Sequence, residues 1–276
     1  MIPGIDVSHW QNEIDWAEVK RSGVKFAFIK ATEFPDKKTS LFIDNKLHIN
    51  VQGAEENDIY WGAYHFFRTH IDPVIQAQVF CETVGVFSSL PPVMDLEAAG
   101  SKGERLNYKV RQFLEEVVRI TGRTPIIYTS GGFWRSYMTY EKLNHTDWAR
   151  SYPLWLAHYT NLWPSPLYPW SVWNFWQYSD HGRLPGIKTH VDLNWFNGSE
   201  DELVEKFVNQ RNAITPEDFH IGQLFENEPT AQSKTLDPQY KGDYQEAGQM
   251  NKIQDSPAPK YSANQEEWIR SYFFKN

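Results

Sequence analysis

The order in which predicted strands and helices follow one another constrains the fold of this chain more than any other feature. Short apolar runs alternate with stretches of helical periodicity, five times in succession. The expected strands cover 4–8, 24–31, 60–67, 92–97 and 125–129, and the expected helices cover 15–22, 41–51, 73–86, 104–120 and 133–143. Three more strands, at 154–159, 172–178 and 190–196, follow without a strong helix between them, and a closing helix covers 200–209.

This alternation favours a parallel sheet, because a helix carries the chain back to the start of the next strand. Eight strands within about 210 residues suit a small closed barrel. We therefore predict an α/β fold, an irregular TIM-like barrel of five βα units followed by three further strands. A doubly wound open sheet is the alternative, but no glycine-rich phosphate-binding loop follows the first strand.

Acidic residues fall on the predicted strands, mostly at their ends. Asp6 ends the first strand, Asp95 and Glu97 end the fourth, and Asp192 lies in the eighth. Residues i and i+2 of a strand share a face, so Asp95 and Glu97 would project together, although an isolated pair of this kind also suits a helix cap or a turn. The first and last strands of a closed barrel are neighbours, and the C-terminal strand ends carry the active site. Four acids would then converge at one rim, with Lys30 as the only obvious cation at that level. Two carboxyl groups that lie close together cannot ionise independently, so one of them is expected to stay protonated near neutral pH.

Composition excludes several classes of partner. The net charge is −8 and no basic tract stands out, so we expect no binding to nucleic acid or to an anionic membrane surface. No apolar run is long enough for membrane insertion, and no signal peptide is expected after Met1. The nine histidines lack a metal-ligand spacing, so we expect no metal and no cofactor, and the single cysteine, Cys81, is expected to be buried. The 12 tryptophans suggest stacking surfaces for carbohydrate as well as a core.

Six short motifs occur in order along residues 1–210. They are GIDVSHWQ at 4–11, KATE at 30–33, GAYHF at 62–66, MDLE at 94–97, WQY at 176–178 and VDLN at 191–194. Together they resemble the glycoside hydrolase family 25 lysozymes, the Chalaropsis-type muramidases that include phage endolysins. The resemblance implies an irregular barrel that hydrolyses the β-1,4 bond between N-acetylmuramic acid and N-acetylglucosamine in bacterial peptidoglycan. One departure is Phe34-Pro35, where the family often has glycine, and it bears on the shape of that edge of the cleft.

The resemblance also implies roles for the four acids. Glu97 would be the general acid that protonates the leaving oxygen. Asp95 would stabilise the positive charge of the transition state or orient the N-acetyl group of the substrate, while Asp6 and Asp192 would hold the charge network and the acid's proton. A retaining, an inverting and an N-acetyl-assisted mechanism all stay open, because the choice depends on the separation of the carboxyl groups.

Aromatic and polar residues near the strand ends are candidates for sugar binding. The expected substrate-binding residues are Tyr64, Tyr128, Trp155, Trp176, Gln177 and Lys30. Four other tryptophans are expected to serve the core or packing, namely Trp10, Trp16, Trp61 and Trp148.

Residues 211–276 lie outside the resemblance. The stretch 227–259 is poor in aliphatic residues and has no periodicity, which is typical of a linker, and 268–274 is strongly aromatic. We therefore expect a catalytic barrel at 1–210 and a C-terminal extension at 211–276 that folds back on the barrel or docks a protein partner.

Two alternatives to an active muramidase remain. One is a non-catalytic component on the same fold that binds the cell wall or assembles into a phage or contractile tail. The other is a chitinase-like enzyme, although such enzymes usually carry an aspartate at the position of Val93. The expected place of action is the bacterial cell wall, reached from the cytosol after phage lysis, on a particle, or by secretion with the signal already removed.

Overall fold

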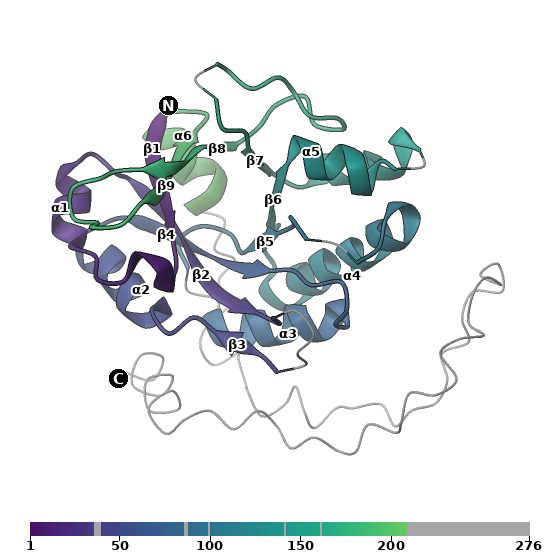
Figure 1. The fold of residues 1–276 in the computed structure, drawn as a ribbon, viewed down its shortest axis with the longest axis horizontal. Helices are drawn as coiled ribbons and strands as arrows, with labels where there is room; N and C mark the ends of the chain where they lie inside the picture. The colour runs from purple at the N-terminus through teal and green to yellow at the C-terminus, as the bar shows by residue number, and fades with distance from the viewer. Residues whose placement is uncertain (36–39, 86–87, 99, 141, 161, 209–276) are drawn as a thin grey trace. The chain divides into compact units, whose positions relative to one another are not determined.

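The computed structural model describes residues 1–208, apart from 36–39, 86–87, 99, 141 and 161, and shows a closed α/β barrel (Figure 1). The barrel strands are β1 (Ile2–Val7), β2 (Phe26–Glu33), β4 (Tyr60–Phe66), β5 (Val93–Asp95), β6 (Ile126–Ser130), β7 (Leu154–Ala157), β8 (Phe175–Gly182) and β9 (Val191–Phe196). The sheet closes because β1 pairs with both β2 and β9. The predicted TIM-like barrel of five βα units and three further strands is therefore confirmed, and the open sheet is excluded.

The last strand departs from the expected parallel arrangement. β9 runs antiparallel to both of its neighbours, β8 and β1, whereas the other barrel pairs are parallel. A hairpin between β8 and β9 needs no crossover helix, which explains why no helix separates these two strands. As a result the start of β9, not its end, lies at the rim where the other strands end. A short strand that was not expected, β3 (Phe42–Ile43), adds antiparallel to the end of β2.

Four helices connect the first five parallel strands. They are α1 (Trp16–Arg21), α2 (Leu47–Glu56), α3 (Pro73–Val84) and α4 (Gly103–Thr121), and α3 and α4 pack against each other (Figure 1). The predicted helix at 41–51 is wrong in its bounds, because its first residues form β3 and α2 continues past Gly53. A Cβ at Gly53 would lie 2.1 Å from Cδ1 of Trp16, so this glycine serves close packing of α2 on α1 and does not end the helix.

The remaining helical segments are short. The predicted helix at 133–143 is replaced by α5 (Gly131–Phe133), a π-helical turn at Trp134–Met138 and a 3₁₀ segment at Leu143–Ser151. A 3₁₀ turn at His9–Gln11 follows β1, and α6 (Glu200–Leu203) continues into a π-helical turn at Val204–Val208.

Aromatic side chains fill the barrel. Phe26, Phe28 and Phe175 are fully buried and Trp155 is 2 % exposed. The ring centroids of Phe28 and Trp155 are 4.4 Å apart, and those of Phe26 and Phe175 are 5.3 Å apart. Gly4 on β1 makes room for this packing, since a Cβ there would lie 2.3 Å from the Phe26 ring. Much of the high aromatic content therefore belongs to the core.

Arg123, buried just before β6, ties separate segments to the barrel. Its guanidinium donates to the carbonyl oxygens of Ser88 (2.7 Å), Ser89 (3.0 Å), Leu90 (3.1 Å) and Phe207 (2.8 Å). One side chain thus holds both the segment before β5 and the last helical turn.

We expect Arg123→Met to lower the free energy of unfolding by about 3–5 kcal/mol, because buried carbonyl groups lose a charged donor. The matched control is Arg111→Met on the exposed face of α4, where Arg111 pairs with Glu115 and the expected loss is about 0.5 kcal/mol or less. Urea unfolding measures both variants. Equal losses would contradict the structural role of Arg123.

The chain divides into two units, Met1–Ala213 and Ile214–Asn276. The first unit contains the barrel. The predicted extension at 211–276 lies outside the described residues, so its aromatic end and its docking role stay predictions. Within the described part of the chain, no helix combines the length and apolar character that crossing a membrane requires.

Candidate active site

The end of β1 and the start of β9 bring two carboxylates together. Asp6 and Asp192 are direct cross-strand partners, and their carboxyl groups hydrogen-bond to each other. Asp6 is 7 % exposed, and its Oδ2 accepts from Gln177 Nε2 at 2.9 Å and from Asn194 Nδ2 at 2.8 Å. Gln177 Nε2 also donates to Oδ2 of Asp192 at 3.2 Å. The expected closeness of Asp6 and Asp192 is confirmed.

This pair holds one proton around neutral pH. Burial raises the pKa of Asp6 to about 6, while hydrogen bonds from Asn194 and Gln177 limit the rise. Burial and the neighbouring Asp6 charge raise the pKa of Asp192 to about 9. A pair that shares one proton buries one negative charge instead of two, which costs less free energy.

We expect the free energy of unfolding to fall as the pH rises from about 5 to 8, because native Asp192 keeps a proton that the unfolded chain releases. The usual pKa of 3.8 applies to the unfolded chain, so the native state binds more protons over this range and the slope is negative. Asp192→Asn should remove this cost and raise the free energy of unfolding at pH 8 by roughly 1–3 kcal/mol. Urea unfolding at both pH values measures the effect.

The control for this prediction is Asp201→Asn, which removes an aspartate from an exposed position in α6. It should leave the difference between the two pH values unchanged. The same difference in wild type and in Asp192→Asn would contradict a proton held by the Asp6–Asp192 pair.

The end of β5 carries the second carboxylate pair. Asp95 is the last residue of β5 and is 6 % exposed, while Glu97 follows in the loop and is open to solvent. The strand ends at Asp95, two residues earlier than predicted, so Glu97 lies in the loop that follows it. Oδ1 of Asp95 is buried and has no hydrogen-bond partner among the described residues.

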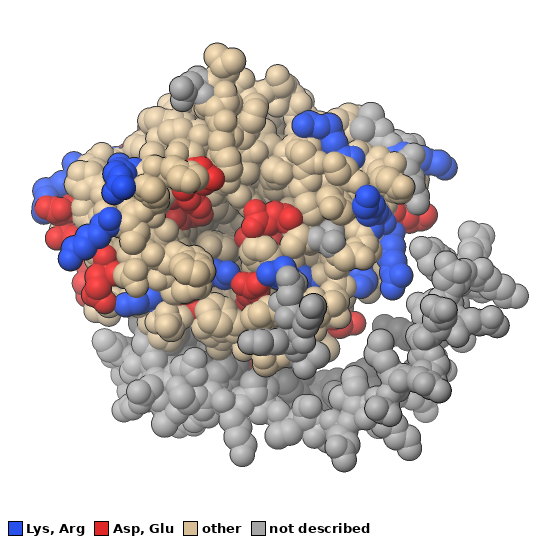
Figure 2. Space-filling view, in the orientation of Figure 1, with Lys and Arg blue, Asp and Glu red and all other residues tan. Residues whose placement is uncertain are grey.

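The pKa of both carboxyl groups is raised. Burial is the main cause for Asp95, and the charge of Glu97 adds to it, while Lys30 opposes it. For Glu97 the main cause is also burial, with Lys30 opposing and Asp192 adding. Part of the Glu97 side chain is exposed to solvent, but the protein atoms around its carboxyl group remove enough water to disfavour the charged form. Figure 2 shows acidic side chains gathered around a hollow on the face of the molecule toward the viewer.

Tyr128 and Gln177 connect the two carboxylate pairs. The hydroxyl of Tyr128 on β6 donates to Oε1 of Gln177 at 2.8 Å and also lies within hydrogen-bond reach of Glu97. Tyr159 donates to the same Oε1 at 3.0 Å. The Gln177 amide nitrogen faces Asp6 and Asp192, so its oxygen must face the tyrosines.

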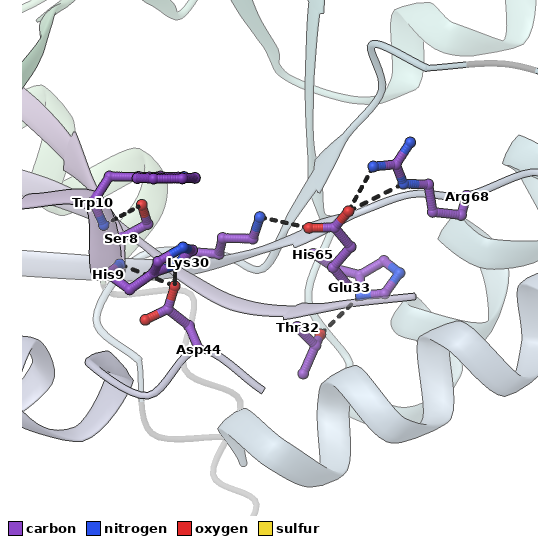
Figure 3. A network of polar contacts seen from close by, with 9 residues as sticks. All are labelled: Ser8, His9, Trp10, Lys30, Thr32, Glu33, Asp44, His65 and Arg68. Carbon is purple, nitrogen blue, oxygen red and sulfur yellow. Dashed lines mark hydrogen bonds and ion pairs between the residues drawn. The ribbon is translucent and has the colours of Figure 1, made fainter. Parts of the chain in front are cut away.

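A row of ion pairs lies along the ends of β2 and β4 (Figure 3), and its two cations act on the charge of Glu97. Lys30 Nζ lies 2.7 Å from Oε2 of Glu33, and Oε1 of Glu33 lies 2.6 Å from Nη2 of Arg68. Burial alone would raise the pKa of Glu33, but the hydrogen bonds from Lys30 and Arg68 outweigh it and lower the pKa. Arg68 is thus a second cation beside the site, and the expectation that Lys30 stands alone is wrong.

Buried polar side chains hold Arg68 in place. Gln76 accepts at Oε1 from the Arg68 backbone nitrogen (2.9 Å) and from His65 Nε2 (3.0 Å), and its Nε2 donates to the Arg68 carbonyl (2.8 Å). Thr32 Oγ1 donates to His65 Nδ1 at 2.8 Å. Burial lowers the pKa of His65 to about 4, so the ring is a neutral structural link at neutral pH. Phe34, at the departure from the family motif, is buried against the edge of this ring.

The structure places the expected substrate-binding residues in two groups. The first group contacts or faces the carboxylates as described and consists of Lys30, Tyr128 and Gln177. Tyr64 on β4 is half-buried and belongs to the same group, and burial and the charges of Asp6 and Asp95 raise its pKa. Trp155 is 2 % exposed with Nε1 donating to Asn194, and Trp176 is 5 % exposed with Nε1 donating to the carbonyl of His158. Both indoles support the site from inside the fold, and direct contact of either with sugar stays a prediction.

Sequence reasoning missed several residues around the acids. Asn194 had a usable signal, because it lies two residues after Asp192 on the same strand face. Arg68 and Tyr159 had none, since only folding brings them to the acids. The packing role expected for Trp10 is wrong, because this side chain is 71 % exposed, whereas Trp16 and Trp61 are buried as expected.

Comparison with known proteins places the chain in a family. The family model described as glycosyl hydrolases family 25 matches residues 5–187. The chain belongs to this family. The family resemblance of the six motifs is confirmed.

Relatives of this family 25 chain include proteins from bacteria. It is 37 % identical over 209 residues to the uncharacterized protein YegX of Escherichia coli, covering 73 % of this chain and 72 % of YegX. It is 34 % identical over 215 residues to Lysozyme M1 of Streptomyces globisporus, covering 74 % of this chain and 70 % of that one. The crystal structure of the bacterial lysozyme from Streptomyces coelicolor superposes with a TM-score of 0.67 at 32 % identity, covering 75 % of this chain and 97 % of that one.

Family membership makes the chain a glycosidase, and the barrel is the one that its structural neighbours share. The described residues contain no group of three or more His, Cys, Asp or Glu side chains arranged to hold a metal ion. Cys81 is a free, buried thiol on α3, as expected.

Proposed function

We propose that this family 25 chain is an N-acetylmuramidase that hydrolyses the β-1,4 bond between N-acetylmuramic acid and N-acetylglucosamine in bacterial peptidoglycan. The observation that carries the proposal is the pair at the end of β5, a solvent-open Glu97 with a raised pKa beside the buried Asp95. The lysozymes among its relatives and structural neighbours support peptidoglycan as the substrate.

Glu97 is the general acid in this proposal. Burial raises the pKa of both carboxyl groups at the end of β5, and the charge of Glu97 adds to the rise for Asp95. Glu97 therefore keeps its proton to a higher pH than a free glutamate does. Asp95 is 6 % exposed, so Glu97 is the group that reaches the glycosidic oxygen. It donates its proton to that oxygen as the bond to the sugar carbon breaks.

Tyr128 adjusts to the protonation state of Glu97. In the acid form, Tyr128 donates its single proton to Oε1 of Gln177 and offers a lone pair to the protonated carboxyl of Glu97. After proton transfer, the hydroxyl turns toward the carboxylate, and this hydrogen bond lowers the pKa of Glu97. Tyr159 still donates to Gln177, so Oε1 keeps a partner throughout.

Asp95, Asp6 and Asp192 supply negative charge where positive charge develops on the sugar. The row Lys30–Glu33–Arg68 limits the excess of that charge, since Lys30 and Arg68 both oppose the rise in the Glu97 pKa. Asp95 lies nearest to the acid in the chain and is the residue that stabilises the oxocarbenium-like centre or orients the substrate N-acetyl group.

Incubation with purified peptidoglycan tests the proposal. We expect new muramic-acid reducing ends, which mass spectrometry identifies after borohydride reduction. Release of N-acetylglucosamine reducing ends, or faster cleavage of chitin oligomers than of peptidoglycan, would point to another glycosidase. Binding without any release would favour the non-catalytic wall or tail component.

A further inference from the structure

Trp10 is an exposed aromatic side chain that the proposed reaction does not use. It lies in the 3₁₀ turn His9–Gln11 that follows β1, and therefore on the same rim as Asp6. The indole is 71 % exposed, although folded proteins usually cover most of such a ring. What this surface can bind depends on the contacts that hold the ring there.

The turn that carries Trp10 is tied to the barrel at both ends. Oγ of Ser8 accepts from the Trp10 backbone nitrogen at 3.3 Å, and the Ser8 nitrogen donates to Oε1 of Gln11 at 2.9 Å. Nε2 of Gln11 donates to the carbonyl of His190, next to the start of β9, at 3.1 Å. The backbone at Trp10 is therefore ordered before any ligand arrives, so binding costs little further ordering.

The ring beneath Trp10 is held by a buried carboxylate. Asp44 is 1 % exposed, and its Oδ2 accepts from the backbone nitrogen of His9 at 3.0 Å and pairs with the ring Nδ1 at 2.7 Å. The His9 ring lies 4.7 Å from the Trp10 ring and 5.6 Å from that of Phe42, between centroids. A buried carboxylate costs free energy unless it is hydrogen-bonded, so Asp44 favours keeping both contacts with His9. These contacts fix the orientation of the His9 ring, against which the Trp10 ring lies.

The rings of Phe42, His9 and Trp10 form a row that leads outward from the carboxylates. Phe42 on β3 lies 6.0 Å, at its ring centre, from Nζ of Lys30. Lys30 lies on β2, one strand away from β5 with its Asp95, and its charge opposes the rise in the pKa of Asp95 and Glu97, so the inner end of the row lies on the side of the acids. Figure 3 shows Trp10 and His9 at one end of the polar network and Arg68 at the other, with Lys30 and Glu33 between them.

We infer that Trp10, supported by His9, forms a saccharide subsite that takes an N-acetylhexosamine ring of the glycan strand outside the cleavage point. The C–H face of a pyranose ring is apolar and weakly positive, and it packs on the negative face of an indole. The inference rests on the proposed function because it assumes that the bound polymer is a glycan. The three rings lie in succession between Lys30 and Trp10, so a glycan bound at the acids can extend toward the indole.

Kinetics on glycan strands of defined length test the subsite. The substrates are peptidoglycan strands stripped of their stem peptides and fractionated by length. We expect Trp10→Ala to raise KM for long strands about tenfold and for the shortest cleaved strands less than twofold, with Trp10→Phe near threefold on long strands. The control is Tyr108→Ala, which removes a 62 % exposed ring from α4 and should change neither value.

Three outcomes would overturn the subsite. An equal loss at every strand length, or a lowered melting temperature in Trp10→Ala, would mean that the indole supports the fold or the catalytic centre. A loss seen only on strands that keep their peptides would make the stem peptide the occupant.

Titration calorimetry separates this inference from the proposed function. In a Glu97→Gln background, stripped long strands should bind about tenfold more weakly when Trp10→Ala is added. Unchanged affinity would overturn the subsite alone. Undiminished hydrolysis by Glu97→Gln would overturn the assigned acid, and the strand-length dependence of KM in Trp10→Ala would still test the subsite.

Discussion

Glu97→Gln should reduce kcat on peptidoglycan by about 10²–10⁴-fold, which corresponds to ~3–5 kcal/mol of transition-state stabilisation. The amide keeps the shape of the side chain but cannot give a proton to the glycosidic oxygen. Because Glu97 is open to solvent, the substitution should leave the fold intact and change KM little. Initial rates of reducing-end release measure the loss.

The control for this variant is Glu104→Gln, which replaces an exposed glutamate in the first turn of α4 and should keep wild-type activity. A second substrate identifies the role. The second substrate is an aryl glycoside of a strongly acidic phenol, whose phenolate leaves without protonation. Glu97→Gln should therefore lose far less activity on this substrate than on peptidoglycan. Wild-type rates on peptidoglycan, or the same loss on both substrates, would remove Glu97 from the role of general acid.

Asp95→Asn should also reduce kcat, by about 10²–10³-fold, because the neutral amide cannot stabilise positive charge on the sugar ring. The aryl glycoside should not restore this loss, since leaving-group protonation is not what Asp95 supplies. The substitution replaces a buried carboxyl group by an amide of equal size, and burial disfavours the charged form of Asp95. The free energy of unfolding should therefore stay the same or rise, which separates a catalytic loss from a loss of folded protein.

Two further measurements complete the test of Asp95. Asp58→Asn, at an exposed turn with positive φ that asparagine tolerates, is the control and should keep full activity. Proton NMR of the first-formed anomer shows whether the configuration is kept or inverted. Full activity of Asp95→Asn on peptidoglycan would contradict its assignment, whatever the stereochemical outcome.

The barrel could be predicted from the sequence because its signals are local. Apolar runs of strand length alternate with helical periodicity, and this pattern survives where individual bounds fail, as at 41–51. The reversed direction of β9 was missed, although the segment between the expected strands at 172–178 and 190–196 is short for a parallel crossover. The helix that continues through Gly53 could not be foreseen, since the reason for that glycine is the indole of Trp16.

The candidate site was predictable in its acids more than in its surroundings. Asp6 and Asp192 follow from strand order in a closed barrel, which makes the first and last strands neighbours. Arg68 could not be placed beside the acids, because it reaches Glu33 only through a loop clamped by buried Gln76. The exposure of Trp10 was also invisible, since the turn that presents it depends on contacts with β9 and with Asp44.

The sequence by itself determined the eight barrel strands and the four carboxylates that meet at one rim, since periodicity and strand order are written along the chain. The tertiary structure alone decided that Asp95 is buried and that Glu97 is open to solvent. It also decided that Asp192 and Asp6 share a proton and that cations border the acids on one side. The physical reason is that desolvation and charge–charge interactions depend on atoms from segments far apart in sequence, which only the folded chain brings within a few ångströms.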